Sequence, residues 1–169
     1  AMDAKQYTDA LLVDVQGKPL IEIGSFQQLP AQTAALLPTV LASAQPRHSE
    51  IFAEADGHRH LDLVIPLLGA EQGGRQPVGA VVLRLRPEHF LFPFIQHWPT
   101  ASASGETLLV RRDGDSVLFI NELRHRQGAG LTLRLPISGT DYPAAFAVSE
   151  MRSGTRQGKD YRGVPLTGR

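Results

Sequence analysis

The chain has 169 residues, 42% of them hydrophobic and 20% charged, and its 17 Lys plus Arg balance 17 Asp plus Glu. This composition is that of a globular protein and excludes a disordered chain, while the zero net charge argues against a nucleic-acid partner. The absence of cysteine excludes disulfides, thiolate metal sites and a cysteine nucleophile. The length fits one large domain or two of about 80 residues.

The first predicted elements are two short strands, 11–13 and 20–23, joined by a turn that contains Gly17. An Ala- and Leu-rich stretch at 30–44 then predicts a helix. Pro38 is expected to interrupt this helix or split it in two.

A second set of strands is predicted further along the chain. Residues 51–55 and 58–67 predict two strands around an Asp56-Gly57 turn, and residues 78–86 predict a third. The Gly- and Gln-rich residues 70–77 predict a loop.

A helix with a kink at Pro93 is expected after Pro87-Glu88. Its aromatic residues share one face and are interpreted as core, with an apolar dimer face as the alternative. They are Phe90, Phe94 and Trp98. Residues 99–105 are small and polar and predict a linker.

The opening pattern returns after this linker. Residues 108–110, Gly114 and 117–120 follow 11–13, Gly17 and 20–23 at a constant offset of 97. A second echo, at an offset of 99, joins Ile65-Pro66-Leu67 to Val164-Pro165-Leu166. Chance repetition of a common hairpin pattern is the alternative, but two echoes in the same order favour a repeat.

The repeat predicts two α+β units, residues 3–98 and residues 99–169. The second unit ends soon after its second echo, so we expect it to lack a counterpart of the strand at 78–86. A missing strand leaves an open sheet edge that tends to pair with another chain.

Two C-terminal segments carry a resemblance to the periplasmic parts of bacterial sensory-box receptors. They are residues 104–125 (SGETLLVRRDGDSVLFINELRH) and 158–166 (GKDYRGVPL), and PEHFLFPFIQHWP at 87–99 looks like the connector between the units. With the hairpin–helix–hairpin order used twice, the chain resembles the double Cache, or tandem PAS-like, sensor regions. The resemblance covers most of residues 7–166 and is weakest over the N-terminal 60.

The resemblance implies a periplasmic domain between two membrane-spanning helices of an inner-membrane receptor. Such regions bind small molecules, often in the membrane-distal unit, and shift the flanking helices of a diguanylate cyclase or histidine kinase. The chain departs from a full region because it lacks the long N-terminal helix, the membrane spans and the end of the second unit. We place no amino-acid-binding signature of the family here, so the resemblance assigns no ligand residue.

The first candidate site is a row of polar residues on one face of the strand at 58–67, namely His58, His60 and Asp62. Two imidazoles and a carboxylate could bind a divalent metal, with His48 or His89 as a third ligand, or could line a pocket for an anion. The favoured alternative is an exposed polar face of a half-buried sheet. Arg84 and Arg86 alternate on the next strand and could face a ligand, although solvent is expected.

The second candidate site comes from the C-terminal segments. Arg124 and Arg162 could clamp a carboxylate while Tyr161 donates a hydrogen bond. The favoured alternative is a structural ion-pair network with Glu106, His125 and Asp160.

These observations favour a sensory module that binds an unidentified small molecule, needs no cofactor or metal, and is not an enzyme. The alternative is a dimerisation or interaction module without a ligand, with a homodimer as one form. A hydrolase or metal enzyme is disfavoured because the nucleophile elbow, the phosphate-binding loop and the His-Glu-x-x-His motif are missing.

Overall fold

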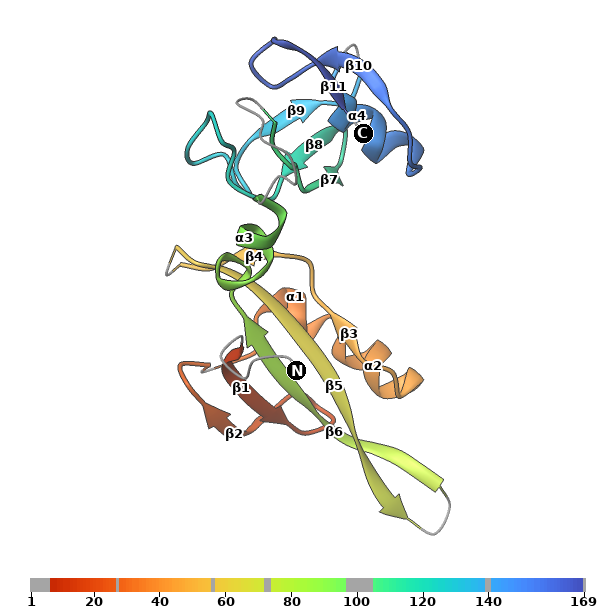
Figure 1. Ribbon diagram of the computed structural model, residues 1–169. Helices are drawn as coiled ribbons and strands as arrows, with labels where there is room; N and C mark the ends of the chain where they lie inside the picture. Colours follow the sequence, from red (N-terminus) through yellow and green to blue (C-terminus); the bar gives the residue numbers. More distant parts are fainter. Residues whose placement is uncertain are drawn as a thin grey trace. The chain divides into compact units, whose positions relative to one another are not determined.

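The computed structural model describes residues 7–26, 28–55, 57–71, 74–96, 105–138 and 141–168. It is an α+β fold with antiparallel strand pairs and short helices, as expected for the fold class (Figure 1). The chain divides into two units, residues 1–94 (unit 1) and residues 95–169 (unit 2). In the described residues, no helix has the length and apolar character needed to cross a membrane.

Unit 1 is built on a sheet whose strands come from both ends of its sequence. The elements up to residue 96 are β1 (Tyr7–Val13), β2 (Pro19–Ile23), α1 (Ala31–Ala34), α2 (Leu37–Ser43), β3 (Arg47–His48), β4 (Phe52–Ala53), β5 (Arg59–Glu71), β6 (Gly74–Leu85), the 3-10 helix η2 (Pro87–His89) and α3 (Leu91–Gln96). The strand order is β2-β1-β6-β5-β3, and β4 also pairs with β5. The last strand, β6, therefore lies between the first strand and β5.

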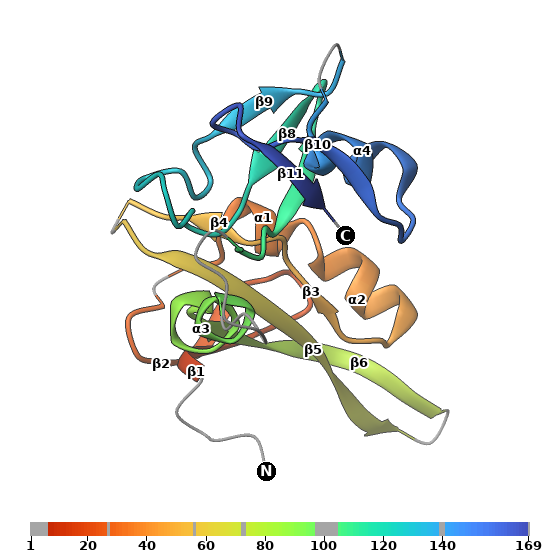
Figure 2. The same ribbon diagram turned by 45° about the horizontal axis from the view of Figure 1, so that its top comes forward.

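The core of unit 1 lies between this sheet and the two helices α1 and α2, which cover one of its faces (Figures 1 and 2). Leu11, Val82 and Val64 are neighbours across β1, β6 and β5, so their side chains share this face. The buried residues of the cluster are Leu11, Val13, Phe26, Leu37, Val40, Val64, Ala80 and Val82.

The predicted helix at 30–44 is split in two, as expected. The break falls just before Leu37, so Pro38 lies in the first turn of α2. The missing N–H of a proline costs no intrahelical hydrogen bond there, which explains why the first turn of α2 accepts Pro38.

The predicted loop at 70–77 is wrong for residues 70–71 and 74–77, which are strand, while residues 72–73 lie outside the described residues. Both strands of the hairpin run on, with Leu68 opposite Pro77 and Gly69 opposite Gln76. Gly69 has a packing role, because a Cβ there would lie 2.6 Å from a methyl group of Val78. Continuous cross-strand pairing outweighs the weak strand preference of Gly and Gln.

The prediction of one buried helix face with Phe90 and Phe94 on it is also wrong. The chain breaks at Phe90 (φ −140°) between η2 and α3, which changes the helical phase. Phe92 is consequently buried, whereas Phe94 is 79% exposed and is not core. Pro93 lies in the first turn of α3 instead of kinking a longer helix. Trp98 and the predicted linker, except for residue 105, lie outside the described residues.

The described residues of unit 2 form two separate small sheets. Its elements are β7 (Val110–Asp113), β8 (Ser116–Phe119), β9 (Arg134–Pro136), α4 (Pro143–Glu150), β10 (Arg156–Lys159) and β11 (Pro165–Gly168). One sheet has the order β7-β8-β9 and the other is the β10-β11 hairpin. Ala145 and Val148 of α4 pack into the core with Val117, Phe119, Leu123, Ala129 and Leu133.

Both units run hairpin, helix, hairpin, and their second hairpins turn in the same way. The Glu54 N–H donates to His58 O (3.2 Å) in unit 1, and the Asp160 N–H donates to Val164 O (2.8 Å) in unit 2. Each turn carries a glycine with positive φ, Gly57 at 79° and Gly163 at 83°.

The two sequence segments that match at an offset of 99, residues 65–67 and 164–166, occupy different positions in these second hairpins. Residues 65–67 lie in the middle of β5, whereas Val164 follows the turn and residues 165–166 begin β11. The likeness of the units therefore rests on the order of elements and on the turns, and this echo adds little to it.

Candidate functional site

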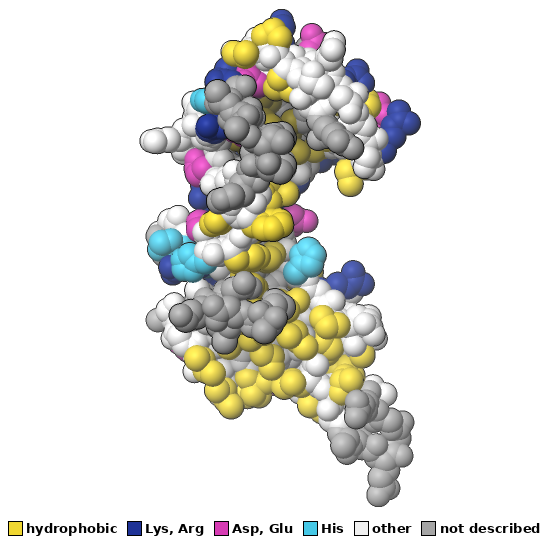
Figure 3. Space-filling model, in the orientation of Figure 1, with side chains coloured by type: hydrophobic (Ala, Val, Ile, Leu, Met, Phe, Trp, Pro, Cys, Tyr) yellow, Lys and Arg dark blue, Asp and Glu magenta, His cyan; other side chains and the backbone are white. Residues whose placement is uncertain are grey.

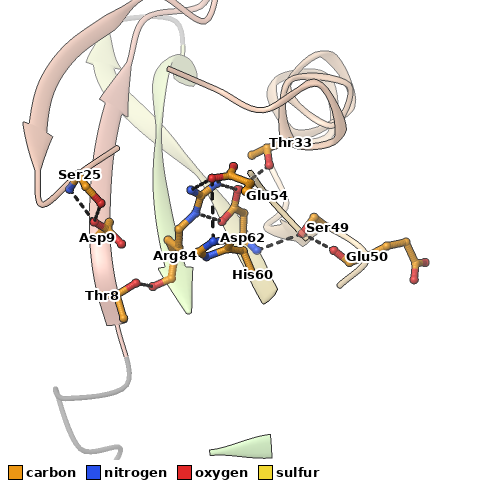
Figure 4. A network of polar contacts seen from close by, with 10 residues as sticks. All are labelled: Thr8, Asp9, Ser25, Thr33, Ser49, Glu50, Glu54, His60, Asp62 and Arg84. Atoms are coloured by element: carbon orange, nitrogen blue, oxygen red, sulfur yellow. Dashed lines mark hydrogen bonds and ion pairs between the residues drawn. The ribbon is translucent and has the colours of Figure 1, made fainter. Parts of the chain in front are cut away.

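A charged cluster lies inside unit 1, on the face of the sheet that α1 covers (Figure 4). Asp62 of β5 and Arg84 of β6 stand opposite each other in the hairpin register, so both side chains leave the sheet on one face. Asp62 is fully buried and Arg84 is 6% exposed. Buried charges are rare unless they are paired, so the contacts of Arg84 matter.

The guanidinium of Arg84 is held by two carboxylates. Its Nε and Nη2 donate to Oδ1 and Oδ2 of Asp62, at 2.9 Å and 3.0 Å. Its Nη1 donates to Oε2 of Glu54 at 3.0 Å, and its Nη2 lies 3.0 Å from Oε1 of Glu54. Both pairs have the forked geometry that fits a planar guanidinium to a carboxylate.

Two aromatic rings contact the same guanidinium. The central carbon of Arg84 lies 4.0 Å from the ring centroid of Phe26 and 5.7 Å from that of Phe52. Rings at these distances attract a cation through their negative faces. The guanidinium is therefore held in position by the two rings as well as by the two carboxylates.

Asp62 is fixed from its other side by hydroxyl groups. The Thr33 hydroxyl, on α1, donates to Oδ2 of Asp62 at 2.6 Å. The Asp62 N–H donates to the Ser49 hydroxyl at 3.0 Å, and the Ser49 N–H donates to Asp62 O at 2.8 Å. These bonds tie β5 to α1 and to the segment before β4.

Glu54 is the member of the cluster that meets solvent, with a side chain that is 33% exposed. Burial alone would lower the pKa of Arg84, but its hydrogen bonds and charge contacts with Asp62 and Glu54 outweigh burial and raise the pKa above its ordinary value. One guanidinium thus faces two carboxylates, and the less buried carboxylate lies at the rim.

The predicted row of His58, His60 and Asp62 was interpreted as an exposed polar face of the sheet, and the structure differs from this. His58 precedes β5 and is exposed, whereas His60 and Asp62 are buried on the inner face, so an exposed polar face is wrong. His60 Nε2 lies 3.9 Å from Oε2 of Glu54, and its ring lies 6.0 Å from that of Phe52. Within the described ranges, no group of three or more His, Cys, Asp or Glu is placed to hold a metal ion.

Asp9 of β1 is a further buried carboxylate of unit 1 (Figure 4). The Ser25 N–H and hydroxyl donate to its Oδ1 at 2.6 Å and 3.0 Å. Burial would raise the pKa of Asp9, but hydrogen bonds from Thr8 and Ser25 hold it below its ordinary value.

The second predicted site separates into two sets of contacts in unit 2. Arg124 and Tyr161 converge on Glu106, to which the Arg124 N–H and the Tyr161 hydroxyl donate at 2.9 Å and 2.8 Å. Arg162 contacts Asp160, with Nη2 2.6 Å from Oδ2. The Arg162 guanidinium thus contacts a carboxylate of the chain, whereas Nη1 of Arg124 donates to Gly105 O at 2.9 Å.

Acid-base properties in unit 2 follow from these contacts. Burial and the hydrogen bond to Glu106 raise the pKa of Tyr161 to about 12. Burial would raise the pKa of Asp160, but hydrogen bonds from Arg162 and the Val164 N–H hold it below its ordinary value.

Sequence reasoning missed Glu54 and the two aromatic residues of the unit 1 cluster, Phe26 and Phe52. Glu54 had one signal, since it stands next to a predicted turn at the end of a predicted strand. Phe26 had none, because it lies outside any element and reaches Arg84 only through the folding of distant segments.

Comparisons with known proteins find similar solved structures but identify no family. No protein-family profile matches the chain, and no curated protein matches it. Similar solved structures include the ligand-binding domain of the Pseudomonas aeruginosa PAO1 amino acid chemoreceptor PctC in complex with GABA (16% identity, TM-score 0.40). They also include an extracellular ligand binding receptor from Desulfohalobium retbaense DSM5692 (16%, 0.48) and VqmA bound to DPO (14%, 0.35).

The matches to these structures are partial. They cover 56%, 93% and 57% of this chain, and 41%, 26% and 59% of the respective solved chains. Similarity at this level transfers neither a family nor a ligand to the chain.

Proposed function

We propose that this chain is the extracytoplasmic sensing domain of a bacterial transmembrane receptor, and that it binds a small carboxylate ligand in unit 1. The observation that carries the proposal is the pairing of buried Arg84 with Glu54, a carboxylate at the rim of the cluster. Desolvating charged groups is costly, so a buried ion pair is weak evidence for a purely stabilising role.

In this proposal Glu54 occupies the place of a ligand carboxylate. Asp62 is fully buried and bound by Thr33, so it stays on Arg84, whereas Glu54 is partly solvent-exposed. A ligand carboxylate that replaces Glu54 keeps the forked pairing and leaves the number of charges on Arg84 unchanged.

Displacement of Glu54 would act on the turn between β4 and β5. The N–H and Nη1 of Arg59, at the start of β5, lie 3.3 Å and 3.4 Å from Oε1 of Glu88 in η2. The Arg59 guanidinium also lies 5.9 Å from the Phe92 ring centroid in α3. With Glu54 displaced, the turn would differ from its ligand-free state, and Arg59 would pass this difference to η2 and α3. The size of the shift depends on how much more tightly the ligand binds one state of the turn than the other.

The wider setting of the proposal follows the sequence resemblance. We propose two tandem PAS-like (Cache) units, 3–98 and 99–169, in the periplasmic part of an inner-membrane receptor. The cytoplasmic output would be a diguanylate cyclase or a histidine kinase. The chain itself would bind its ligand without catalysis, cofactor or nucleic acid.

Thermal unfolding in the presence of amino acids, small carboxylates, polyamines and divalent metals tests the ligand class. A carboxylate at 100 times its Kd adds about 2.7 kcal/mol to the free energy of unfolding. For a unit of this size the Tm then rises on the order of 10 °C. A response to polyamines or metals alone would contradict the proposal.

The Glu54→Gln variant tests the place of binding. Glutamine has the same shape but no charge, so it competes less with a ligand carboxylate for Arg84, and we expect about tenfold tighter binding by calorimetry. Glu22→Gln on the exposed strand β2 is the matched control and leaves the affinity unchanged. Equal affinities for all three proteins would place the site elsewhere.

A specific observation also favours the interaction module as a second candidate. β2 is an edge strand, and Leu20, Ile21 and Ile23 on it are 56%, 58% and 65% exposed. Hydrophobic side chains gather over this part of unit 1 (Figure 3). An exposed apolar edge strand favours pairing with a second copy. Sedimentation should then give a dimer that Ile21→Lys converts to a monomer, and a monomeric wild type would contradict this candidate.

A further inference from the structure

Unit 1 has a cavity that shares no residue with the Arg84 cluster. It has a volume of about 460 Å³ and is lined by the β1–β2 turn, the segment before α1, and residues of α1 and α2. This volume falls within the ~300–1,000 Å³ of most small-molecule pockets. The cavity is therefore large enough for a small organic molecule.

None of the described residues that line this cavity is charged. Its apolar residues include Val15, which is 42% exposed, and Leu29 and Leu37, which pack with the core of unit 1. Its polar side chains are those of Gln16 and Gln28, whose amides can each donate and accept hydrogen bonds. A charged molecule would lose hydration there without gaining an ionic partner, whereas a neutral molecule with one polar group fits.

The β1–β2 turn gives the cavity a wall that is fixed before any molecule binds. The Gly17 N–H donates to Asp14 O, and the Asp14 N–H donates to Lys18 O, both at 3.0 Å. The N–H groups of Gln16 and Lys18 donate to Oδ1 of Asp14 at 2.9 Å. Gly17 has a φ of 81°, and a Cβ there would lie 3.1 Å from Cδ2 of Leu37, so the turn and α2 are in close contact. A preformed wall lowers the entropic cost of binding.

The α1 helix connects the cavity to the Arg84 cluster. Ala34 of α1 lines the cavity, and the preceding residue, Thr33, donates its hydroxyl to Oδ2 of Asp62 at 2.6 Å. α1 has only four residues, and no side chain caps its N-terminus. A helix this short has little stability of its own, so its position depends on what packs against it. A molecule that packs on Ala34 therefore also acts on the position of Thr33.

We propose that this cavity binds a small neutral molecule, mainly apolar and with one hydrogen-bonding group, and that α1 transmits its binding to Asp62 and Arg84. The two sites differ in the charge of their ligands, because the Arg84 guanidinium attracts an anion and the uncharged cavity disfavours one. Binding in the cavity does not depend on the carboxylate proposed for Arg84. Only the mutual effect of the two ligands rests on the proposed function, and linkage makes this effect equal in both directions.

Three probes built on one ring system test the site by NMR titration of the 169-residue chain. They are indole, which is neutral, indole-3-carboxylate, which is an anion, and tryptamine, which is a cation. We expect indole to shift the amide signals of Gly17, Ala34 and Leu37 with a Kd on the order of 1 mM, and to shift that of Asp62 through α1. The two ions should bind this cavity at least about tenfold more weakly. A shift of the Arg84 signal by indole-3-carboxylate would report the proposed carboxylate site separately.

Variants separate binding in the cavity from binding elsewhere. Ala34→Leu keeps a strong helix former in α1 but places a larger side chain in the cavity, and it should weaken indole binding about tenfold. Ala42→Leu, at an exposed position of α2 outside the lining, is the matched control and should leave the affinity unchanged. Thr33→Val removes the hydroxyl and keeps the shape of the side chain. It should retain the indole shift of Gly17 and abolish that of Asp62.

Each part of the proposal has a result that would overturn it. Unshifted Gly17, Ala34 and Leu37 signals up to the solubility limit of indole, or equal affinities of Ala34→Leu and Ala42→Leu, would refute the site. Equal affinity for indole and its two charged analogues would refute the preference for neutral molecules. An Asp62 signal that does not shift in the wild type, or that shifts equally in Thr33→Val, would refute the coupling through α1.

Discussion

The Arg84–Asp62 pair of unit 1 is almost fully buried, whereas the Arg162–Asp160 pair of unit 2 leaves its arginine partly exposed. The side chains of Arg84 and Asp62 are 7% and 0% exposed, while those of Arg162 and Asp160 are 32% and 5% exposed. The difference follows the strands, because β6 brings Arg84 directly opposite Asp62 on the inner face. In unit 2 the Arg162–Asp160 pair joins neighbouring residues of one turn. A cross-strand position thus allows an ion pair to be desolvated, and a turn position does not.

The largest expected effect comes from breaking the buried pair. Arg84→Met leaves Asp62 as an unpaired buried charge and should lower the free energy of unfolding by about 3–5 kcal/mol in urea. Arg162→Met should cost much less, because water screens the pair in unit 2. Similar losses for the two variants would contradict the proposed difference between the units.

A smaller effect is expected from the neutral polar residue that unit 2 buries. Asn121 is 1% exposed, and its side chain accepts from Leu109 N–H and donates to Thr107 O and Glu122 O. Asn121→Ala leaves backbone groups without these partners and should cost about 1–3 kcal/mol. Ser153→Ala, at an exposed position of the same unit, is the control for urea unfolding. If Asn121→Ala leaves the free energy of unfolding unchanged, the stability of unit 2 does not depend on this residue.

The smallest effect is a pH dependence in unit 2. The pKa of Tyr161 is about 12 in the folded protein and near 10 in the unfolded chain. The folded state therefore binds the phenolic proton more tightly. Its stabilisation is complete below pH 10 and is lost as the pH rises toward 12.

The difference in free energy of unfolding between the wild type and Tyr161→Phe, measured from pH 8 to pH 12, isolates this contribution. It should be roughly 1 kcal/mol below pH 10, where the hydrogen bond to Glu106 is intact. It should shrink as the pH rises above 10. A difference that stays constant up to pH 12 would contradict the assigned contact.

Local patterns in the sequence predicted much of the fold. The hairpins around Gly17 and Gly114, the split helix near Pro38 and the strand at 78–86 are all present. Glycine at a positive φ, proline at a helix start and alternation along a strand are constraints that neighbouring residues impose. For this reason they can be recognised without knowledge of distant contacts.

The candidate site could be predicted only in part. Alternation showed that His60 and Asp62 share a face, but it does not indicate which face meets the core. Asp62 faces inward because Arg84, 22 residues later, neutralises it from the neighbouring strand. Arg84 was named as a candidate ligand residue, although solvent was the expected environment of its side chain. Glu54, Phe26 and Phe52 complete the cluster through contacts between segments that no local pattern connects.

The sequence by itself determined the turns, the short helices and the alternation of side chains along each strand, because these depend on neighbouring residues. Tertiary structure decided that β5 extends to Glu71 and β6 begins at Gly74, that Phe92 and not Phe94 is buried, and that Arg84 is an interior charge. Each of these depends on the free energy of long-range pairing and burial, which outweighs local preference and is set by which distant segments meet.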